Sequence, residues 1–162
     1  MRRPAPDKPN LLELINEVGA DKPDLLIIEC GSNDLTNLDC DPVKLAKNLL
    51  ILADYSVIVH KVKLVIFCSV LLRGKCREVS RELFQQRMTT LNKNLLLGCK
   101  SSPLFCFFMF RGFWKDPIRS WSSDLIHPGT AADSDGFRKY VRNIRDCLQT
   151  AAAMLFQKTS VR

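Results

Sequence analysis

The chain has 162 residues, of which 46% are hydrophobic and 25% charged, and its formal net charge is +7. This composition is ordinary for one globular domain with a single core. No apolar run is long enough to span a bilayer, and residues 1–10 lack the apolar stretch of a signal peptide, so we expect a cytoplasmic protein without a membrane partner. The seven Cys residues are scattered without paired spacing, which favours reduced thiols over disulfides or a zinc site.

Apolar periodicity predicts helices and strands in alternation along the chain. The expected elements are a helix from Leu11 to Gly19, a strand Asp24–Cys30, a helix starting at Asp41 and Pro42, a strand Leu64–Leu72, a helix Ser80–Leu97, a strand Leu104–Phe110 and a helix Ser134–Phe156 with Val141 and Leu148 on its apolar side. Continuous apolar strands suit a parallel sheet with right-handed crossovers. We therefore expect an α/β domain over residues 11–157, a flexible N-terminal segment over residues 1–10 and a tail over residues 158–162.

Two short polar motifs lie where α/β proteins bind ligands. Gly31-Ser32-Asn33-Asp34 directly follows the first strand, and Asp124-Leu125-Ile126-His127 precedes the last helix. A Gly-x-Asn turn can direct a backbone N–H and a side-chain amide at a developing oxyanion. An Asp three residues before a His can hold the imidazole as a general base. Each motif also has a structural interpretation, the first as an ordinary turn and the second as a helix-start pair.

These motifs resemble a known family: LIIECGSNDL is similar to the third conserved block, and SSDLIHP to the fifth, of the SGNH hydrolases, also called GDSL-type esterases. The resemblance covers Leu11 to Leu148 and implies a three-layer α/β/α SGNH-type (flavodoxin-like) parallel sheet that lacks the first strands. It implies hydrolysis of a small acyl-ester substrate without a metal or an organic cofactor. In that chemistry His127 accepts a proton, Asp124 orients His127, and Gly31 with Asn33 stabilises the oxyanion.

The family's Ser nucleophile is missing, because no Gly-Asp-Ser occurs in the sequence. Ser69 lies inside an apolar strand with no Gly before it, so its hydroxyl is expected to bond to backbone instead of attacking a substrate. The resemblance therefore predicts a catalytically incomplete esterase-type domain, whether a truncated gene model, a degenerate copy (a pseudoenzyme) or a piece that needs a partner.

The family fold also predicts how the site and the sheet edge are arranged. The absent first strand would pair with the strand Asp24–Cys30, so we expect an exposed apolar edge there that a partner could cover. Asn33 and His127 should meet at the carboxyl ends of the strands Asp24–Cys30 and Leu104–Phe110, with Asp124 bonded to the His127 ring. The other histidine, His60, is expected to be a solvated surface residue.

Positive charge is concentrated in two regions. The first follows the second strand and contains Arg73, Lys75, Arg77, Arg81 and Arg87. In the second, Arg138, Arg142 and Arg145 recur at i, i+4 and i+7 in the last helix and form a stripe beside its apolar side. This stripe is either a solvated helix face or a contact for the phosphates of RNA or DNA, although no aromatic stacking motif interleaves with it.

The family resemblance adds weight to the second interpretation of the stripe. Some SGNH-like domains have lost the catalytic Ser and bind RNA, and related esterase-type domains occur in retroelement-encoded proteins. The alternative function is therefore a non-catalytic nucleic-acid-binding or retroelement-derived module that uses this basic surface.

Overall fold

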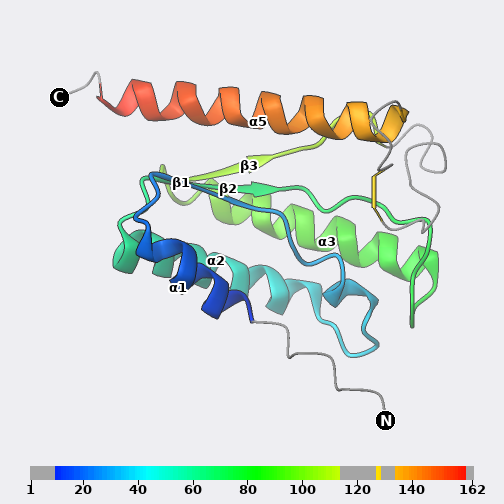
Figure 1. The fold of residues 1–162 in the computed structure, drawn as a ribbon. Coiled ribbons are helices and arrows are strands. Elements are labelled where there is room, and N and C mark those ends of the chain that lie inside the picture. Colours follow the sequence, from blue (N-terminus) through cyan, green and yellow to red (C-terminus); the bar gives the residue numbers. More distant parts are fainter. Residues whose placement is uncertain (1–9, 114–126, 129–133, 160–162) are drawn as a thin grey trace, which may run out of the picture.

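The computed structural model describes residues 10–113, 127–128 and 134–159, which form three layers (Figure 1). The elements are α1 (Leu11–Ala20), β1 (Leu25–Ile28), the 3-10 helix η1 (Asp34–Thr36), α2 (Pro42–His60), β2 (Leu64–Cys68), α3 (Arg81–Cys99), β3 (Phe105–Phe108) and α5 (Asp135–Thr159). The strands form a parallel sheet in the order β1-β2-β3. Helices α1, α2 and α3 lie on one side of the sheet and α5 on the other, so the α/β class and the alternation of elements are confirmed.

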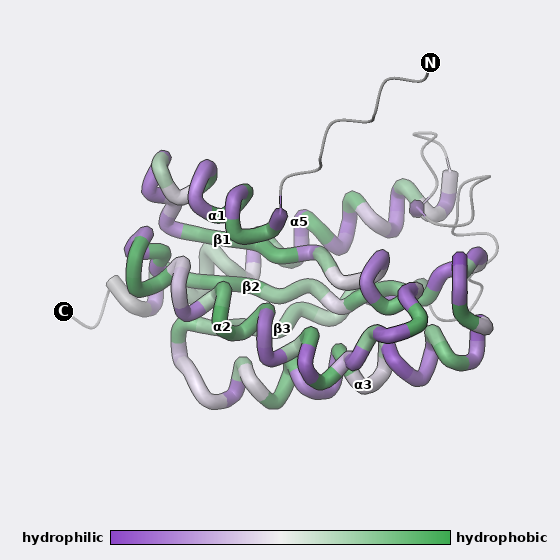
Figure 2. The backbone as a smooth tube through the Cα atoms, turned by 90° about the horizontal axis from the view of Figure 1, so that it is seen from below, coloured by the Kyte–Doolittle hydropathy of each residue, from purple (hydrophilic) through white to green (hydrophobic). Residues whose placement is uncertain are grey.

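The central strand β2 is buried on both faces, which explains its uninterrupted apolar sequence. Val65 and Phe67 belong to the core beneath α2 and α3. Leu64, Ile66 and Cys68 point the other way and belong to the core beneath α5. The strands accordingly appear as hydrophobic segments between helices of mixed character (Figure 2).

Side-chain caps fix where the helices on the first face begin. The Asp41 carboxylate accepts hydrogen bonds from the backbone N–H groups of Val43 and Lys44 at the start of α2. The Ser80 hydroxyl accepts from the N–H of Leu83 at the start of α3. Both residues satisfy N–H groups that have no partner within the helix. The helix starts predicted at Asp41 and Ser80 are therefore confirmed.

The expectation that His60 is a solvated surface residue is wrong. Its ring is half-buried between α1 and α2, makes an edge contact with Tyr55 and lies 3.1 Å from the Asn16 amide oxygen. A Cβ at Gly19 would overlap this ring, so the close packing of α1 on α2 requires glycine there. The sequence suggested that Gly19 ends the helix, whereas α1 continues through it to Ala20.

The apolar side expected for the last helix is partly wrong. Val141 and Leu148 are 48% and 47% exposed, whereas Asn143, Cys147 and Ala151 face the sheet and are buried. The small Cys147 and Ala151 side chains let α5 approach the sheet closely, and Asn143 has three hydrogen bonds to backbone groups. Small side chains therefore lie at the buried contact of α5 with the sheet, and the larger Ile144 and Leu155 pack against the same core and are partly buried.

The outer edge of β1 pairs with no other strand in the described part of the chain. An apolar groove of about 200 Å³ lies there between α1 and β1. Leu14 and Val18 of α1 line it and remain 40% and 45% exposed. The unpaired edge expected from the sequence is therefore present, but it is not exposed: the side chains of β1 are partly or fully buried, and the exposed apolar side chains beside it belong to α1.

Two further properties of the described residues bear on earlier expectations. All seven Cys side chains are free thiols. No helix in the described ranges combines the length and the hydropathy needed to cross a bilayer.

Candidate functional site

The turn after β1 depends on Gly31. Its φ is +98°, a left-handed conformation that costs a residue with a Cβ conformational strain. A Cβ at this position would also lie 3.0 Å from the Leu91 side chain. The Gly31 carbonyl then accepts from the N–H of Leu35, which leads the chain into η1. This turn places Ser32 and Asn33 just beyond the carboxyl end of β1.

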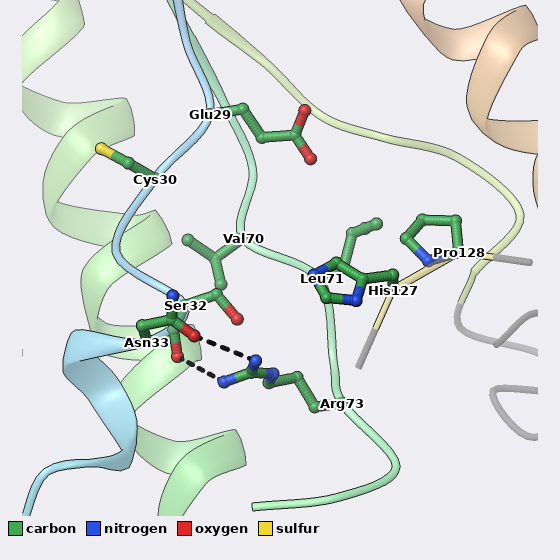
Figure 3. Close-up of a pocket in the computed structure, with 9 residues that line it drawn as sticks. All are labelled: Glu29, Cys30, Ser32, Asn33, Val70, Leu71, Arg73, His127 and Pro128. Carbon is green, nitrogen blue, oxygen red and sulfur yellow. Dashed lines mark hydrogen bonds between the residues drawn. The ribbon is translucent and has the colours of Figure 1, made fainter. Parts of the chain in front are cut away.

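A cavity of about 140 Å³ lies beyond the carboxyl ends of β1 and β2 (Figure 3). Its walls come from the segment after β1, the segment after β2 and the short described segment at residues 127–128. The lining residues are Glu29, Cys30, Ser32, Asn33, Val70, Leu71, Arg73, His127 and Pro128. Ligands of open parallel sheets bind in this position, beyond the carboxyl ends of the strands.

Asn33 and His127 are far apart in the sequence but line the same cavity, as expected from the two motifs. The strand expected to complete the site with β1 was β3, but the second wall follows β2, because β2 lies between β1 and β3. Gly31 is buried and is not among the residues that line the cavity, so its observed role is to form the turn. Asp124, predicted to orient His127, lies outside the described residues.

Arg73 is a component of the site that the sequence did not single out. Its residue is 3% exposed, and its guanidinium donates to the Ser32 carbonyl at 3.1 Å and to the Asn33 side-chain oxygen at 3.0 Å (Figure 3). The sequence presented it only as a member of a basic cluster. The feature of the sequence that could have identified Arg73 was its position just after the second apolar strand. The carboxyl end of that strand lies at the same edge of the sheet as the Gly31–Asn33 turn.

Arg87 from α3 supports the next part of the same loop. It donates to the backbone carbonyls of Leu35, Asn37 and Leu38 at 3.2, 2.6 and 2.7 Å. Arg73 and Arg87 therefore hold neighbouring stretches of the chain that follows Gly31. Their positive charges are directed at the protein's own carbonyl groups, and this part of the first basic cluster has a structural role.

Glu29 connects the cavity to α5. The Tyr140 hydroxyl donates a hydrogen bond to the Glu29 carboxylate at 2.6 Å. Partial burial raises the pKa of Glu29, and the Tyr140 hydrogen bond partly offsets this effect. Burial, together with the hydrogen bond to Glu29, also raises the pKa of Tyr140. The phenol therefore stays protonated and keeps donating to the carboxylate at neutral pH.

Two nucleophilic side chains near the sheet, Cys30 and Ser69, are not set up to attack a substrate. Burial, followed by the charges of Asp34 and Glu29, raises the pKa of the Cys30 thiol to about 12, so Cys30 is not a thiolate at neutral pH. Ser69 is buried, and its hydroxyl accepts from the backbone N–H of Phe110 at 3.0 Å. The expectation that Ser69 bonds to backbone is confirmed.

The basic stripe lies apart from the cavity, on α5. Arg138, Arg142 and Arg145 are all exposed. The Arg145 side chain is 66% exposed and lies 3.5 Å from the Asp146 carboxylate, a long contact that leaves its guanidinium in water. The second basic region is thus presented to solvent, unlike Arg73 and Arg87.

No group of three or more His, Cys, Asp or Glu side chains in the described ranges is arranged to hold a metal ion. Comparison of the chain with protein-family models, with curated proteins and with solved structures finds no match. Function is therefore inferred from the chemistry of the cavity.

Proposed function

We propose that this chain supplies the oxyanion-binding and general-base parts of a serine-esterase site of the SGNH type, which acts on acyl esters. The convergence of Asn33 and His127 in one cavity beyond the carboxyl ends of parallel strands supports this proposal. Asn33 offers an amide N–H to the oxyanion, and His127 offers an imidazole to the attacking hydroxyl. In this assignment Asp124 orients the His127 ring.

The nucleophile in this proposal comes from outside the sequence given. A Ser hydroxyl attacks the ester carbonyl carbon while His127 takes its proton. The resulting oxyanion accepts a hydrogen bond from Asn33, and its collapse expels the alcohol, which recovers the proton from His127. Water then attacks the acyl-Ser by the same route and releases the carboxylic acid.

The free edge of β1 is the place where the missing part would pack. Glu29 and Cys30 line both the groove beside β1 and the cavity, so the two spaces adjoin. A strand added in parallel to β1 would end beside Asn33, where the attacking hydroxyl is needed. The partner that covers this edge would then be the source of the nucleophile.

Binding of butyrate, the product of a short acyl ester, tests the oxyanion and base parts in the chain as it stands. We expect the Asn33 side-chain amide and the His127 ring to shift together in an NMR titration, with one dissociation constant. The amide of Asn143, which is buried under α5, is the internal reference. Butyrate shifts that survive both Asn33→Asp and His127→Ala would contradict the proposal.

An esterase assay tests the absence of the nucleophile. The chain should hydrolyse p-nitrophenyl butyrate no faster than a denatured control, because oxyanion stabilisation without an attacking group leaves little acceleration. A burst of p-nitrophenol that His127→Ala abolishes would show that the chain contains its own nucleophile.

A second candidate function is binding of RNA or DNA through the basic stripe. The observation in its favour is that Arg138, Arg142 and Arg145 are all exposed along one helix, apart from the cavity. Phosphate contacts by such a stripe need neither the cavity nor a nucleophile.

A further inference from the structure

We propose that Arg73 is the positioning residue that fixes the Asn33 amide with its N–H group toward the cavity. This inference rests on the proposed function, in which that N–H meets the oxyanion. It assigns Arg73 a role beyond its charge, because Arg73 would decide which end of the amide the substrate meets.

The hydrogen-bonding chemistry of the two groups sets the orientation. A guanidinium has five N–H donors and no acceptor, so only the oxygen of the Asn33 amide can face it. The contact of 3.0 Å between the Arg73 Nη2 and the Asn33 Oδ1 therefore leaves the NH₂ group at the other end of the amide. Without that contact the amide could rotate and turn its oxygen to the cavity, where it would repel an oxyanion.

A second hydrogen bond keeps Arg73 itself in place. Its Nη1 donates to the Ser32 carbonyl at 3.1 Å, so the planar guanidinium bridges the backbone and the side chain of adjacent residues. Such a two-point contact fixes geometry better than one flexible ammonium group could. Arg73 is also 3% exposed, so its guanidinium is largely shielded from water, whereas Ser32 is half-buried and Asn33 is exposed.

Arg87 provides a matched comparison within the same loop. It too donates to backbone carbonyls after Gly31, but it bonds to Leu35, Asn37 and Leu38 and has no hydrogen bond to Asn33. Loss of Arg87 should loosen the loop without releasing the Asn33 amide. A positioning role for Arg73 can therefore be separated from a general role in loop stability.

The first experiment measures the mobility of the Asn33 side-chain NH₂ group by ¹⁵N relaxation. We expect a high order parameter in the wild type and in Arg87→Met, and a low one in Arg73→Met. Should Arg73→Met fail to fold, Arg73→Lys takes its place, because Lys keeps a cation but cannot bridge both acceptors. An Asn33 order parameter that stays high in the folded Arg73 variant would overturn the inference.

The second experiment measures butyrate binding to the same variants. We expect the dissociation constant to rise about tenfold in Arg73→Met and to change less than twofold in Arg87→Met. Asn33→Asp should keep the contact with Arg73, and hence the thermal stability, but should bind no butyrate because it has no N–H to donate. Equal affinity of Arg73→Met and the wild type would overturn the inference and leave the proposed function standing.

The two readouts separate the two proposals. If butyrate does not bind the wild type, the proposed function fails. The order parameter of the Asn33 amide then still decides whether Arg73 orients it, because that measurement needs neither substrate nor activity.

Discussion

Arg73 and Arg87 direct their guanidinium groups at carbonyl oxygens of the loop after β1, whereas the arginines of α5 extend into solvent. In the sequence both regions are clusters of positive charge near an apolar segment. The difference arises because the loop after β1 leaves carbonyl groups without partners in a sheet or helix ladder, and the two guanidinium groups donate to them. On α5 the helix satisfies its own carbonyls, and the Arg138, Arg142 and Arg145 side chains lie on its exposed surface.

The largest effect should come from the buried member of the first region. Replacing Arg73 by Met leaves the Ser32 carbonyl and the Asn33 side-chain oxygen without their charged donor. We expect the free energy of unfolding to fall by about 3 kcal/mol. Urea denaturation measures it, and a loss below 1 kcal/mol would place Arg73 in the same class as the exposed arginines of α5.

The turn that creates the loop should be nearly as sensitive. Gly31→Ala forces a Cβ into a left-handed conformation with φ of +98° and against the Leu91 side chain. The expected loss is about 2 kcal/mol by thermal or urea unfolding. Because the turn also aims Asn33, this variant should weaken butyrate binding as well. Unchanged stability would show that the loop after β1 tolerates another path.

Arg87 should matter less than Arg73, since it is only half-buried. Its replacement by Met removes hydrogen bonds to three carbonyls that water can partly replace. We expect a loss of about 1–2 kcal/mol in urea denaturation. A larger loss than that of Arg73→Met would reverse the ranking of the two arginines.

The pH dependence of stability should report the environment of Glu29. Because its pKa is raised above the ordinary value of 4.5, folding favours its protonated form. Its contribution to stability is thus fully present below pH 4.5 and is lost as the pH rises through the raised pKa. As the pH rises from 4.5 through the raised pKa, the free energy of unfolding of the wild type should therefore fall relative to that of Glu29→Gln, which does not titrate.

Tyr140→Phe provides the control for this pH effect. It removes the hydrogen bond that lowers the pKa of Glu29, so the loss of stability should move to higher pH. Parallel stability profiles of the wild type and Glu29→Gln between pH 4 and 8 would contradict the assignment.

The smallest effect on stability should come from the exposed region. Replacing Arg138, Arg142 and Arg145 together by Gln should change the free energy of unfolding by less than about 0.5 kcal/mol. If the stripe contacts phosphates, the affinity for single-stranded RNA should fall, and its salt dependence should flatten by roughly one unit per lost contact. Fluorescence anisotropy over a series of salt concentrations measures both.

A charge-matched variant controls for net charge in that experiment. Lys44, Lys47 and Lys93 are exposed on α2 and α3, and their joint replacement by Gln removes the same charge elsewhere. This control should keep most of the affinity. Equal losses of RNA affinity in the two triple variants would show that binding depends on net charge in general and not on the stripe.

Local features of the sequence were enough to predict the order of the elements and the turn at the candidate site, although the strands expected over Leu64–Leu72 and Leu104–Phe110 end earlier, at Cys68 and Phe108. Asp41 and Ser80 marked helix starts because a capping side chain acts within a few residues of its own position. Gly31 and Asn33 marked the turn for the same reason, since a positive φ is a property of one residue and its neighbours. The alternation of helices and strands followed from periodicity, which requires no knowledge of contact partners.

Contacts between distant segments decided the rest. The strand order placed β2 beside β1, so Arg73, which follows β2, reached Asn33, although periodicity gives no strand order. His60 became half-buried because Gly19 of another helix packs on its ring. Burial and hydrogen-bond partners depend on which surfaces meet in the folded chain, so the sequence determined the parts of the site and only the tertiary structure decided which of them touch.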